Sequence, residues 1–226
     1  MKIKQYMNKF QNHIIAFLLA GLLLSCEKEP SYDYGPFRLD IVTYQANNIP
    51  AYFILEKDKE ESQSLIPTER LSLNNIKDGT RVMLQYIKDE AINDKEYYIT
   101  IKGLSRILSD SLRGATPELM KLLQNDTIRL NSIWKSGDYL NIKYQSEFHN
   151  IPHSQILVTE KDKLMNDTIV AEIRHNRRND PPGYWSNSVS SYYIGALKNR
   201  PCKILKVYVN NINYPEKYYY FRLKKE

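Results

Sequence analysis

From Phe37 onward, apolar and polar residues alternate along the chain in short runs. Leu39 and Ile41, for example, alternate with Arg38 and Asp40. Val, Ile, Tyr and Thr dominate these runs, and Gly, Asn and Asp separate them. A period of two with these residue types is typical of β-strands joined by tight turns. The sequence therefore predicts an all-β protein.

Five such runs follow one another in the first part of the chain. They cover residues 37–43, 51–56, 81–87, 96–102 and 105–108. Turn signals, Asp78-Gly79 and Asn93-Asp94, come directly before two of them. Five strands in so short a segment suit a small barrel such as an OB-fold, although an open meander fits almost as well. We predict an OB-like barrel domain over residues 37–114.

One segment has helical rather than strand spacing. Thr116 precedes Pro117, and three leucines then recur at the spacing of one helical face. Thr is a favoured N-cap residue, and Pro is favoured at the first helical position. The pattern predicts a short helix over residues 116–124, inside a linker of residues 115–126.

Seven further strand-like runs follow the helix. They cover residues 127–134, 139–145, 155–160, 168–175, 188–194, 203–210 and 217–224. Two tight turns, Ser136-Gly137-Asp138 and Pro181-Pro182-Gly183, separate some of them. Short strands at this spacing indicate a β-sandwich of roughly immunoglobulin type, without the Cys–Trp–Cys signature of antibody domains. We predict this sandwich domain over residues 127–226.

The first 25 residues have a different pattern. Three lysines precede the apolar run Ile14–Leu24, which is too short to span a bilayer and is typical of the core of a signal peptide. The run ends in Leu23-Leu24-Ser25-Cys26, which resembles the bacterial lipobox. An ordinary secretory signal with a chance cysteine is the alternative. The resemblance implies that residues 1–25 are removed and that Cys26 is lipidated.

Lipidation of Cys26 has consequences for location. Two or three acyl chains on one residue anchor a protein stably, whereas one chain does so only marginally. Residues 26–36 are polar, contain Pro and Gly, and are predicted to form a lipidated tether. We expect the chain to be held in the cell envelope, at the outer membrane, facing either the periplasm or the cell surface.

Charge and cysteine content exclude two classes of protein. The full chain has 32 basic and 26 acidic residues, but the leader takes three lysines with it, which leaves a net charge of +3. Such a near-balanced charge in an exported protein argues against nucleic acid as a partner. Once Cys26 carries lipid, Cys202 has no second cysteine with which to form a disulfide, so no disulfide framework is possible. Cys202 is predicted to be a small buried apolar residue.

Histidines provide the weak candidates for a metal site. His149 and His153 are four residues apart, but Pro152 places them in a loop rather than on a helix. His175 lies on a separate predicted strand with Asp180 nearby in the sequence. These three side chains could converge on zinc, or they could be loop and strand-end histidines. We expect no metal and no other cofactor.

The segment Glu172–Asn176 is the most distinctive polar string. Alternation places Glu172, Arg174 and Asn176 on one face of a strand. A carboxylate, a guanidinium and an amide in one row form a possible binding surface. A structural salt bridge between the first two is the alternative.

Eighteen tyrosines are unusual for a chain of this length. Adjacent pairs such as Tyr192-Tyr193 must direct their rings to opposite faces of a strand, so some rings face solvent. Together with Trp185 in the preceding predicted loop, Tyr192 and Tyr193 complete the predicted binding surface for a protein or a sugar. The alternative is that tyrosine is used simply as a good strand residue.

Three segments resemble the NigD-like family of Bacteroidetes lipoproteins. They are Gly79–Tyr86, Ile133–Asn141 and Glu172–Asn176, and the combination of Ile-Trp-Lys-Ser-Gly-Asp-Tyr-Leu-Asn with Glu-Ile-Arg-His-Asn is the most specific part. The resemblance implies an N-terminal OB-like domain followed by a β-sandwich. It brings no catalytic residue, so it bears on fold and location rather than on activity.

No motif for nucleophilic catalysis or phosphate binding occurs in the sequence. The preferred interpretation is therefore a non-catalytic, lipid-anchored envelope protein that recognises a protein or a glycan. Two alternatives remain. One is an envelope hydrolase that uses carboxylates or a histidine metal site, and the other is a structural or assembly subunit of an outer-membrane complex. The oligomeric state is not predicted.

Overall fold

The structure is a computed structural model that describes residues 36–226 apart from 59–60, 71–72, 74, 161–166 and 224–226. Cys26 and the predicted leader lie outside the described residues. Within the described ranges, no helix has the length and apolar character needed to span a bilayer. The fold is all-β with a short helix, as predicted.

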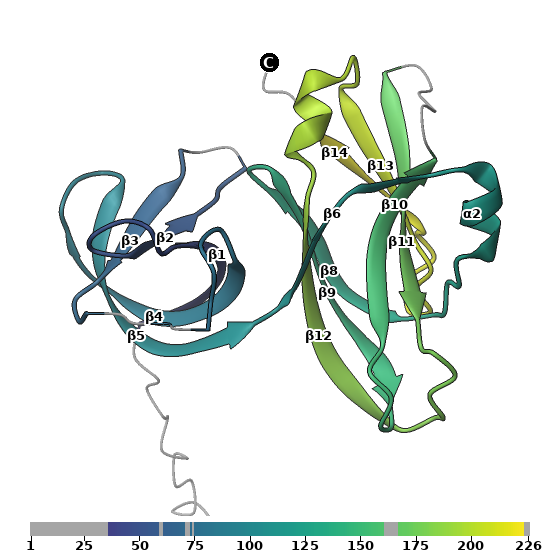
Figure 1. The fold of residues 1–226 in the computed structure, drawn as a ribbon, viewed down its shortest axis with the longest axis horizontal. Helices are drawn as coiled ribbons and strands as arrows, with labels where there is room; N and C mark the ends of the chain where they lie inside the picture. Colours follow the sequence, from purple (N-terminus) through teal and green to yellow (C-terminus); the bar gives the residue numbers. More distant parts are fainter. Residues whose placement is uncertain (1–35, 59–60, 71–72, 74, 161–166, 224–226) are drawn as a thin grey trace, which may run out of the picture. The chain divides into compact units, whose positions relative to one another are not determined.

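The N-terminal part is a closed five-stranded barrel (Figure 1). Its strands are β1 (Phe37–Gln45), β2 (Tyr52–Leu55), β3 (Gln63–Pro67), β4 (Arg81–Ala91) and β5 (Glu96–Arg106), in the order β1-β2-β3-β5-β4. Strand β3 was not predicted, although its parallel pairing with β5 closes the barrel. The predicted strand over residues 105–108 is wrong, because residues 105 and 106 end β5 and Leu108 begins another strand.

The barrel interior is filled by side chains from every strand. The buried apolar residues are Val42, Tyr44, Phe53, Leu65, Val82, Leu84, Tyr86 and Ile99. These residues come from all five strands because alternate positions of a barrel strand face inward. The interior is therefore a packed core.

The C-terminal part consists of two β-sheets (Figure 1). Its strands are β6 (Leu108–Ser111), β7 (Arg113–Ala115), β8 (Arg129–Ser136), β9 (Tyr139–Phe148), β10 (Ser154–Glu160), β11 (Thr168–Asn176), β12 (Tyr184–Tyr193), β13 (Ile204–Val209) and β14 (Tyr218–Arg222). One sheet has the order β14-β13-β11-β10-β7 and the other β6-β12-β9-β8. All seven predicted sandwich strands are present.

Strands β6 and β7 are additions to the predicted sandwich. They fall at the end of the predicted barrel range, with only Ala115 in the predicted linker, yet β6 pairs with β12 and β7 pairs with β10. Both pairings are parallel. The chain thus passes directly from the last barrel strand to the edges of both sandwich sheets.

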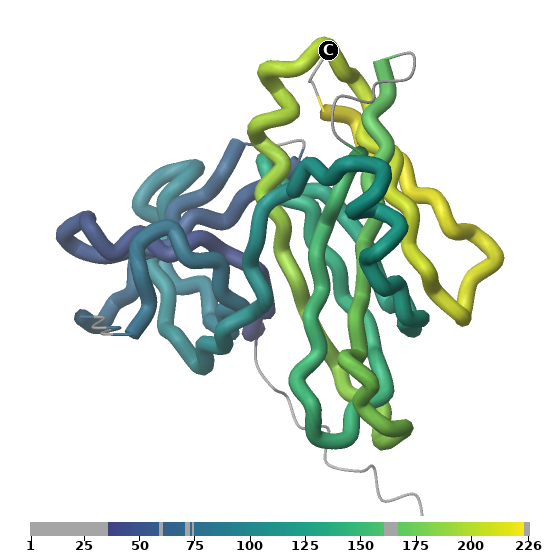
Figure 2. The backbone as a smooth tube through the Cα atoms, turned by 45° about the vertical axis from the view of Figure 1, so that its right-hand side comes forward, coloured from purple at the N-terminus to yellow at the C-terminus, as the bar shows by residue number. Residues whose placement is uncertain are grey.

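The predicted helix is present as α2 (Pro117–Leu122). The Oγ1 atom of its N-cap residue, Thr116, accepts a hydrogen bond from Leu119 N at 3.3 Å. The helix lies beside β10 and β11 (Figure 2), and Arg174 of β11 donates to Leu123 O at 3.2 Å. The sheet and the turn that ends α2 are therefore directly connected.

Between the two sheets lies the larger apolar core. It contains Ile128, Leu130, Leu140, Ile142, Tyr144, Leu157, Ile169, Ala171, Ile173, Tyr192, Ile194, Leu197, Cys202, Leu205, Val207, Val209 and Leu223. Cys202 is fully buried among these residues, as predicted. The short 3₁₀ helix η1 (Gly195–Asn199) follows β12 and ends shortly before Cys202 in the sequence.

Candidate functional site

The row formed by Glu172, Arg174 and Asn176 lies on one face of β11. Arg174 Nη2 is 2.6 Å from Glu172 Oε2, and Asn176 Oδ1 accepts a hydrogen bond from Arg178 N at 2.7 Å. The second guanidinium nitrogen of Arg174 donates to the turn after α2, as described above. The salt bridge that was the alternative interpretation is thus present, and a binding role for this row stays a prediction.

The aromatic residues of the predicted surface divide between two environments. Tyr192 is fully buried, and its hydroxyl donates to Gln155 Oε1 at 2.9 Å. Its assignment to a surface is therefore corrected: the ring faces the space between the sheets. Tyr193 points the other way and stays exposed, with its ring centroid 5.6 Å from that of Tyr139.

Trp185 lies on β12 rather than in a preceding loop, because β12 begins at Tyr184. Its ring is half-buried beneath Arg129, whose Cζ atom is 4.0 Å from the ring centroid. Trp185 belongs to the four-stranded sheet and Glu172 to the five-stranded one. The predicted residues therefore do not converge on one surface.

Two of the three histidines do meet, as the pairing of β10 with β11 requires. His153 Nδ1 is 3.1 Å from His175 Nε2 and 3.4 Å from Ser146 Oγ. His153 Nε2 is 3.1 Å from Asp180 Oδ2. If His153 Nε2 donates to the carboxylate, its Nδ1 accepts, and His175 Nε2 supplies the hydrogen.

Asp180 connects this cluster to the loop after β9. Its carboxylate accepts backbone hydrogen bonds from His149, Asn150 and Ile151 at 2.7, 3.1 and 2.9 Å. Burial alone would raise the pKa of Asp180, but these hydrogen bonds and the one from His153 hold it well below its usual range. Asp180 therefore stays ionised and fixes the loop.

The weak metal candidates His149, His153 and His175 do not gather into a ligand set in the described part of the chain. His149 contributes its backbone N–H to the cluster and is otherwise exposed. Burial, together with the nearby His153, lowers the pKa of His175 to about 4. Among the described residues, no group of three or more His, Cys, Asp or Glu side chains is placed to hold a metal ion.

A cleft of about 650 Å³ lies beside β12, next to the histidine cluster. Aromatic rings, polar side chains of three strands, and residues of the barrel line it. The lining residues are Leu39, Met83, Arg106, Ile107, Leu108, Lys143, Tyr144, Ser146, Phe148, His153, Gln155, Tyr184, Ser186, Asn187, Ser188 and Val189. Among the described residues, the lining thus includes two cations, Arg106 and Lys143, and no carboxylate.

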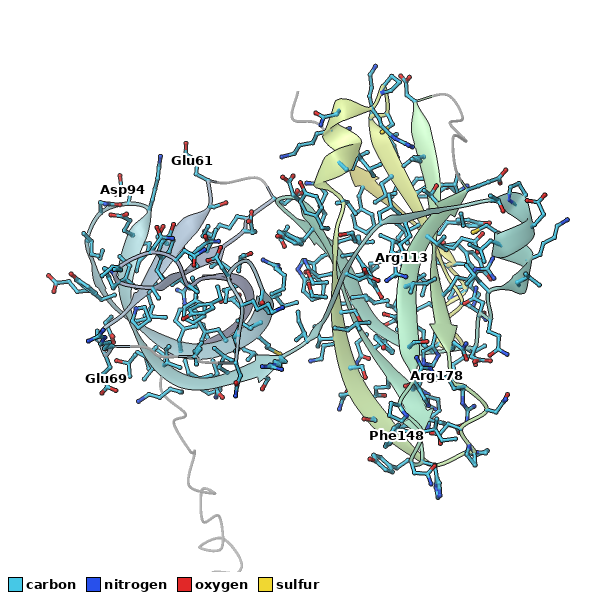
Figure 3. All side chains as sticks on the ribbon, viewed as in Figure 1. Glu61, Glu69, Asp94, Arg113, Phe148 and Arg178 are labelled. Carbon is cyan, nitrogen blue, oxygen red and sulfur yellow. The ribbon has the colours of Figure 1, made fainter. Side chains whose placement is uncertain are left out.

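One end of the cleft is formed where β9 ends and β12 begins, at Phe148 (Figure 3). The ring centroid of Phe148 is 5.8 Å from that of Tyr184 and 5.7 Å from that of His153. The backbone at Gly183 passes close to the backbone of Phe148, and only glycine fits there, because a Cβ atom would lie 2.1 Å from Phe148 O. The Pro181-Pro182-Gly183 segment, which follows the turn at Arg178-Asn179, therefore positions an aromatic wall of the cleft.

A second polar cluster lies between β4 of the barrel and the four-stranded sheet. Arg81 is 1% exposed; its Nη1 donates to Thr43 Oγ1 at 3.0 Å, its Nη2 to Asn141 Oδ1 at 3.4 Å and its Nε to Ser191 Oγ at 3.3 Å. Its Cζ atom is 4.1 Å from the centroid of the Tyr139 ring. Each donor nitrogen of the guanidinium thus has a protein partner.

Further contacts surround Arg81. Burial lowers the pKa of Arg81 to about 10, while Tyr139 and Glu56 oppose that change, so the side chain remains charged at neutral pH. Gly137, with φ at 52°, lies so close to Glu56 that a Cβ atom would be 2.3 Å from Glu56 Oε2. Lys135 forms an ion pair with Asp58 nearby.

The three segments that carry the family resemblance contribute residues to these two clusters. Gly79–Tyr86 supplies Arg81, and Ile133–Asn141 supplies its partners Tyr139 and Asn141. Glu172–Asn176 supplies His175 and the ion pair with Arg174. The first two segments meet at one polar cluster, and the third helps to form the other.

Comparison with known families gives a match over residues 112–223 to the NigD-like C-terminal beta sandwich domain. The C-terminal half of the chain belongs to the NigD-like family. The matched segment begins just after β6 and contains β7 to β14, in agreement with the sheet order. A search of curated proteins gives no significant match.

Solved structures of Bacteroides proteins share the fold of this chain. A protein of unknown function from Bacteroides vulgatus is 21% identical, with a TM-score of 0.68, and the match covers 82% of this chain and 90% of that one. A candidate lipoprotein of Bacteroides fragilis is 13% identical, with a TM-score of 0.61 and coverages of 83% and 98%.

A third similar structure is a NigD-like immunity protein from Bacteroides caccae. It is 16% identical, with a TM-score of 0.58, and the match covers 84% of this chain and 94% of that one. At these identities the three likenesses show a common fold. They extend over the barrel as well as the sandwich, because each covers more than four fifths of this chain.

Proposed function

We propose that this NigD-like chain is a lipid-anchored protein of the bacterial cell envelope that binds a protein partner and catalyses no reaction. The observation that carries the proposal is the cleft beside β12. It combines the exposed ring of Tyr184 and the half-buried ring of Phe148 with two cations, and its described lining contains no carboxylate. Aromatic residues and arginine are enriched where proteins bind one another, which favours a protein partner at such a site.

The nature of the partner and the location are supported independently. One similar structure is described as an immunity protein, which favours a protein over a glycan as the partner. Another is described as a candidate lipoprotein, in agreement with the lipobox-like Leu23-Leu24-Ser25-Cys26. As part of the proposal, Cys26 carries the lipid and the anchored chain lies at the outer membrane.

Crosslinking in intact cells tests this function. A photoreactive phenylalanine analogue replaces Asn187 in the cleft, and in a matched variant it replaces Tyr220, which is 63% exposed on β14. One dominant protein crosslinked from position 187 and none from position 220 is the expected result. In a Cys26→Ala chain, loss of that product would show that partner binding depends on the anchor.

Other outcomes would count against the proposal. A partner captured only from position 220 would move the binding surface to the β13–β14 face. No crosslinked protein from either position, together with retention of the native chain on a glycan array, would replace the protein partner with a sugar.

A further inference from the structure

Strand β12 is paired on both sides over only part of its length. Strand β9 pairs with it from Tyr184 to Tyr193, whereas β6 pairs with it only from Ser190 to Tyr193. In the described part of the chain, no other strand pairs with β12. The segment Tyr184–Val189 therefore has a sheet partner on one side and the cleft on the other.

The direction of the backbone groups along this edge follows from one hydrogen bond. Tyr193 O accepts from Leu112 N at 3.0 Å, so the backbone groups of Tyr193 point toward β6. The register between β12 and β9 runs without a bulge from Tyr184 to Tyr193, and backbone groups alternate sides along a strand. Trp185 and Asn187 therefore direct their N–H and C=O groups toward the same edge, beyond the end of β6.

The side chains beside this edge divide into two walls. Even-numbered positions of β12 face the space between the sheets, as buried Tyr192 shows, and on that side the cleft presents Tyr144 and Phe148. Odd-numbered positions face the other way, where Val189 is paired with Lys143 and Arg106 completes the lining. One wall is therefore mainly aromatic and the other is cationic.

We propose that an extended peptide segment of the partner adds to β12 as a further strand along Tyr184–Val189. This inference rests on the proposed function, in which the cleft binds a protein. The backbone groups of Trp185 and Asn187 pair with the peptide backbone, as in other cases of β-strand addition. Six residues of strand offer about 20 Å of edge, enough for a peptide of about six residues.

The walls also define the sequence character of the peptide. Since side chains of a strand alternate between faces, every second residue lies against Tyr144 and Phe148 and is apolar. The residues between them lie toward Lys143 and Arg106 and are acidic, because the described lining contains these cations and no carboxylate. An alternating apolar–acidic segment is therefore the class of ligand that fits.

A binding titration tests the proposal on the mature chain. The probes are fluorescent ten-residue peptides that alternate Val with Glu or Ile with Asp, and a Val–Glu peptide of the same composition arranged in two blocks. We expect the alternating peptides to bind at least tenfold more tightly than the block peptide. Failure of every alternating peptide to bind would overturn strand addition. The crosslinking result at position 187 tests the proposed function separately, because it detects a protein partner however that partner binds.

A matched pair of variants separates backbone from side-chain recognition. Asn187→Pro removes the N–H group that faces the cleft, at a position where an edge strand tolerates proline. Asn187→Ala keeps that group and removes the side chain. We expect a loss of at least tenfold in affinity for Asn187→Pro and less than threefold for Asn187→Ala, and equal losses would overturn the proposal.

Peptides methylated on backbone nitrogens make the same test without a variant, should Asn187→Pro fail to fold. One peptide is methylated at its odd positions and the other at its even positions. Only one edge of the bound strand faces β12, so one of these peptides should bind like the parent and the other at least tenfold more weakly. Equal binding of the two would contradict strand addition.

Two other occupants are distinguishable by hydrogen exchange of the Trp185 and Asn187 amides. We expect these amides to be unprotected in the peptide-free chain and protected on addition of peptide. Protection without peptide that rises with protein concentration would identify a second copy as the occupant. Protection that is independent of concentration, and is lost when residues 27–35 are replaced by a Gly-Ser sequence, would identify the tether. Either result would overturn the proposal.

Discussion

The two halves of β12 have the same strand period and similar residues but very different surroundings. Ser190 and Ser191 are fully buried, between β6 and β9, and Ser191 accepts a hydrogen bond from Arg81. Ser186 and Ser188 are only half-buried, and they line the cleft. A serine in this strand is buried or accessible according to what covers the strand, not according to its own chemistry.

Strand β12 is covered on both edges near Tyr193 and on only one edge near Tyr184 in the described part of the chain. In the half that ends at Tyr193, β6 completes the backbone pairing, and Ser191 Oγ accepts from Arg81 and donates to Asn141 Oδ1. In the half that begins at Tyr184, one edge has no described sheet partner. Exposed strand edges are templates for pairing, and native proteins usually cover them. An open edge lined by aromatic rings is therefore the part of this sheet with the clearest capacity for binding.

Hydrogen exchange measures this contrast most directly. The amides of Ser191 and Tyr193 face β6, and those of Trp185 and Asn187 face the same way without a sheet partner. In the isolated chain we expect the first pair to exchange about a thousandfold more slowly, or slower still, because their exchange requires opening of the sheet. The measurement is native-state exchange followed by NMR. Similar rates for the four amides would show that the two halves of the edge do not differ.

Replacing Arg81 should weaken the closed half. Arg81→Leu leaves Asn141, Ser191 and Thr43 without their buried donor, which costs about 3 kcal/mol of unfolding free energy. Arg81→Lys keeps the charge but lacks the planar guanidinium that donates to all three partners, so its loss of unfolding free energy should be smaller than that of Arg81→Leu. Urea unfolding measures both. Asn187→Ala, at an exposed position, is the control, and we expect it to change the free energy of unfolding by less than about 0.5 kcal/mol. An equally small change for Arg81→Leu would contradict the role assigned to this cluster.

Most of the fold was predictable because its long strands carry a clear period of two. The strands that escaped prediction, β3, β6 and β7, have three to five residues each and pair in parallel with distant strands. Their partners are fixed by the closed barrel and the sandwich edges, and a short local pattern contains no information about such partners. The open half of β12 was missed for the same reason, since it is defined by where β6 ends.

The site residues were only partly predictable. The pair Tyr192-Tyr193 guarantees one inward and one outward ring, but the sequence does not say which, because register against the core decides it. Likewise, the spacing of His153 and His175 in the sequence does not reveal their contact. That contact follows from the antiparallel pairing of β10 with β11, in which Gln155 lies opposite His175.

Acid should destabilise the chain through His175. Its ring centroid is 6.0 Å from that of Tyr144, which is paired with Ser188 in the open half of β12. The pKa of His175 is about 4 in the folded chain and near 6.5 in the unfolded chain, because burial and the nearby His153 disfavour its charged form. Above pH 6.5 neither state is protonated at this ring. As the pH falls from 6.5 to 4, the unfolded state takes up a proton that the folded state does not, and the free energy of unfolding decreases.

His175→Gln should remove about 3 kcal/mol of that decrease, measured as the difference between urea unfolding at pH 7 and at pH 4. His149→Gln changes an exposed imidazole and serves as the matched control. The same decrease in the wild-type chain and in His175→Gln would show that His175 is protonated in the fold. Equal effects of the two variants would show that the decrease does not depend on the buried ring.

The smallest effect concerns a single hydroxyl at the closed end of β12. Tyr192→Phe removes the donor to Gln155 Oε1, a bond of 2.9 Å between buried atoms, and keeps the ring in the core. We expect a loss of about 1 kcal/mol in unfolding free energy, since the buried amide oxygen then lacks its partner. Tyr193→Phe removes the same hydroxyl from an exposed ring and should change stability by less than about 0.5 kcal/mol. Because the two residues are adjacent and the change is identical, a reversed order would mean that the alternation of faces along β12 is opposite to the one described. That result would also contradict the assignment of the Trp185 and Asn187 backbone groups to the open edge, because this assignment rests on the same alternation.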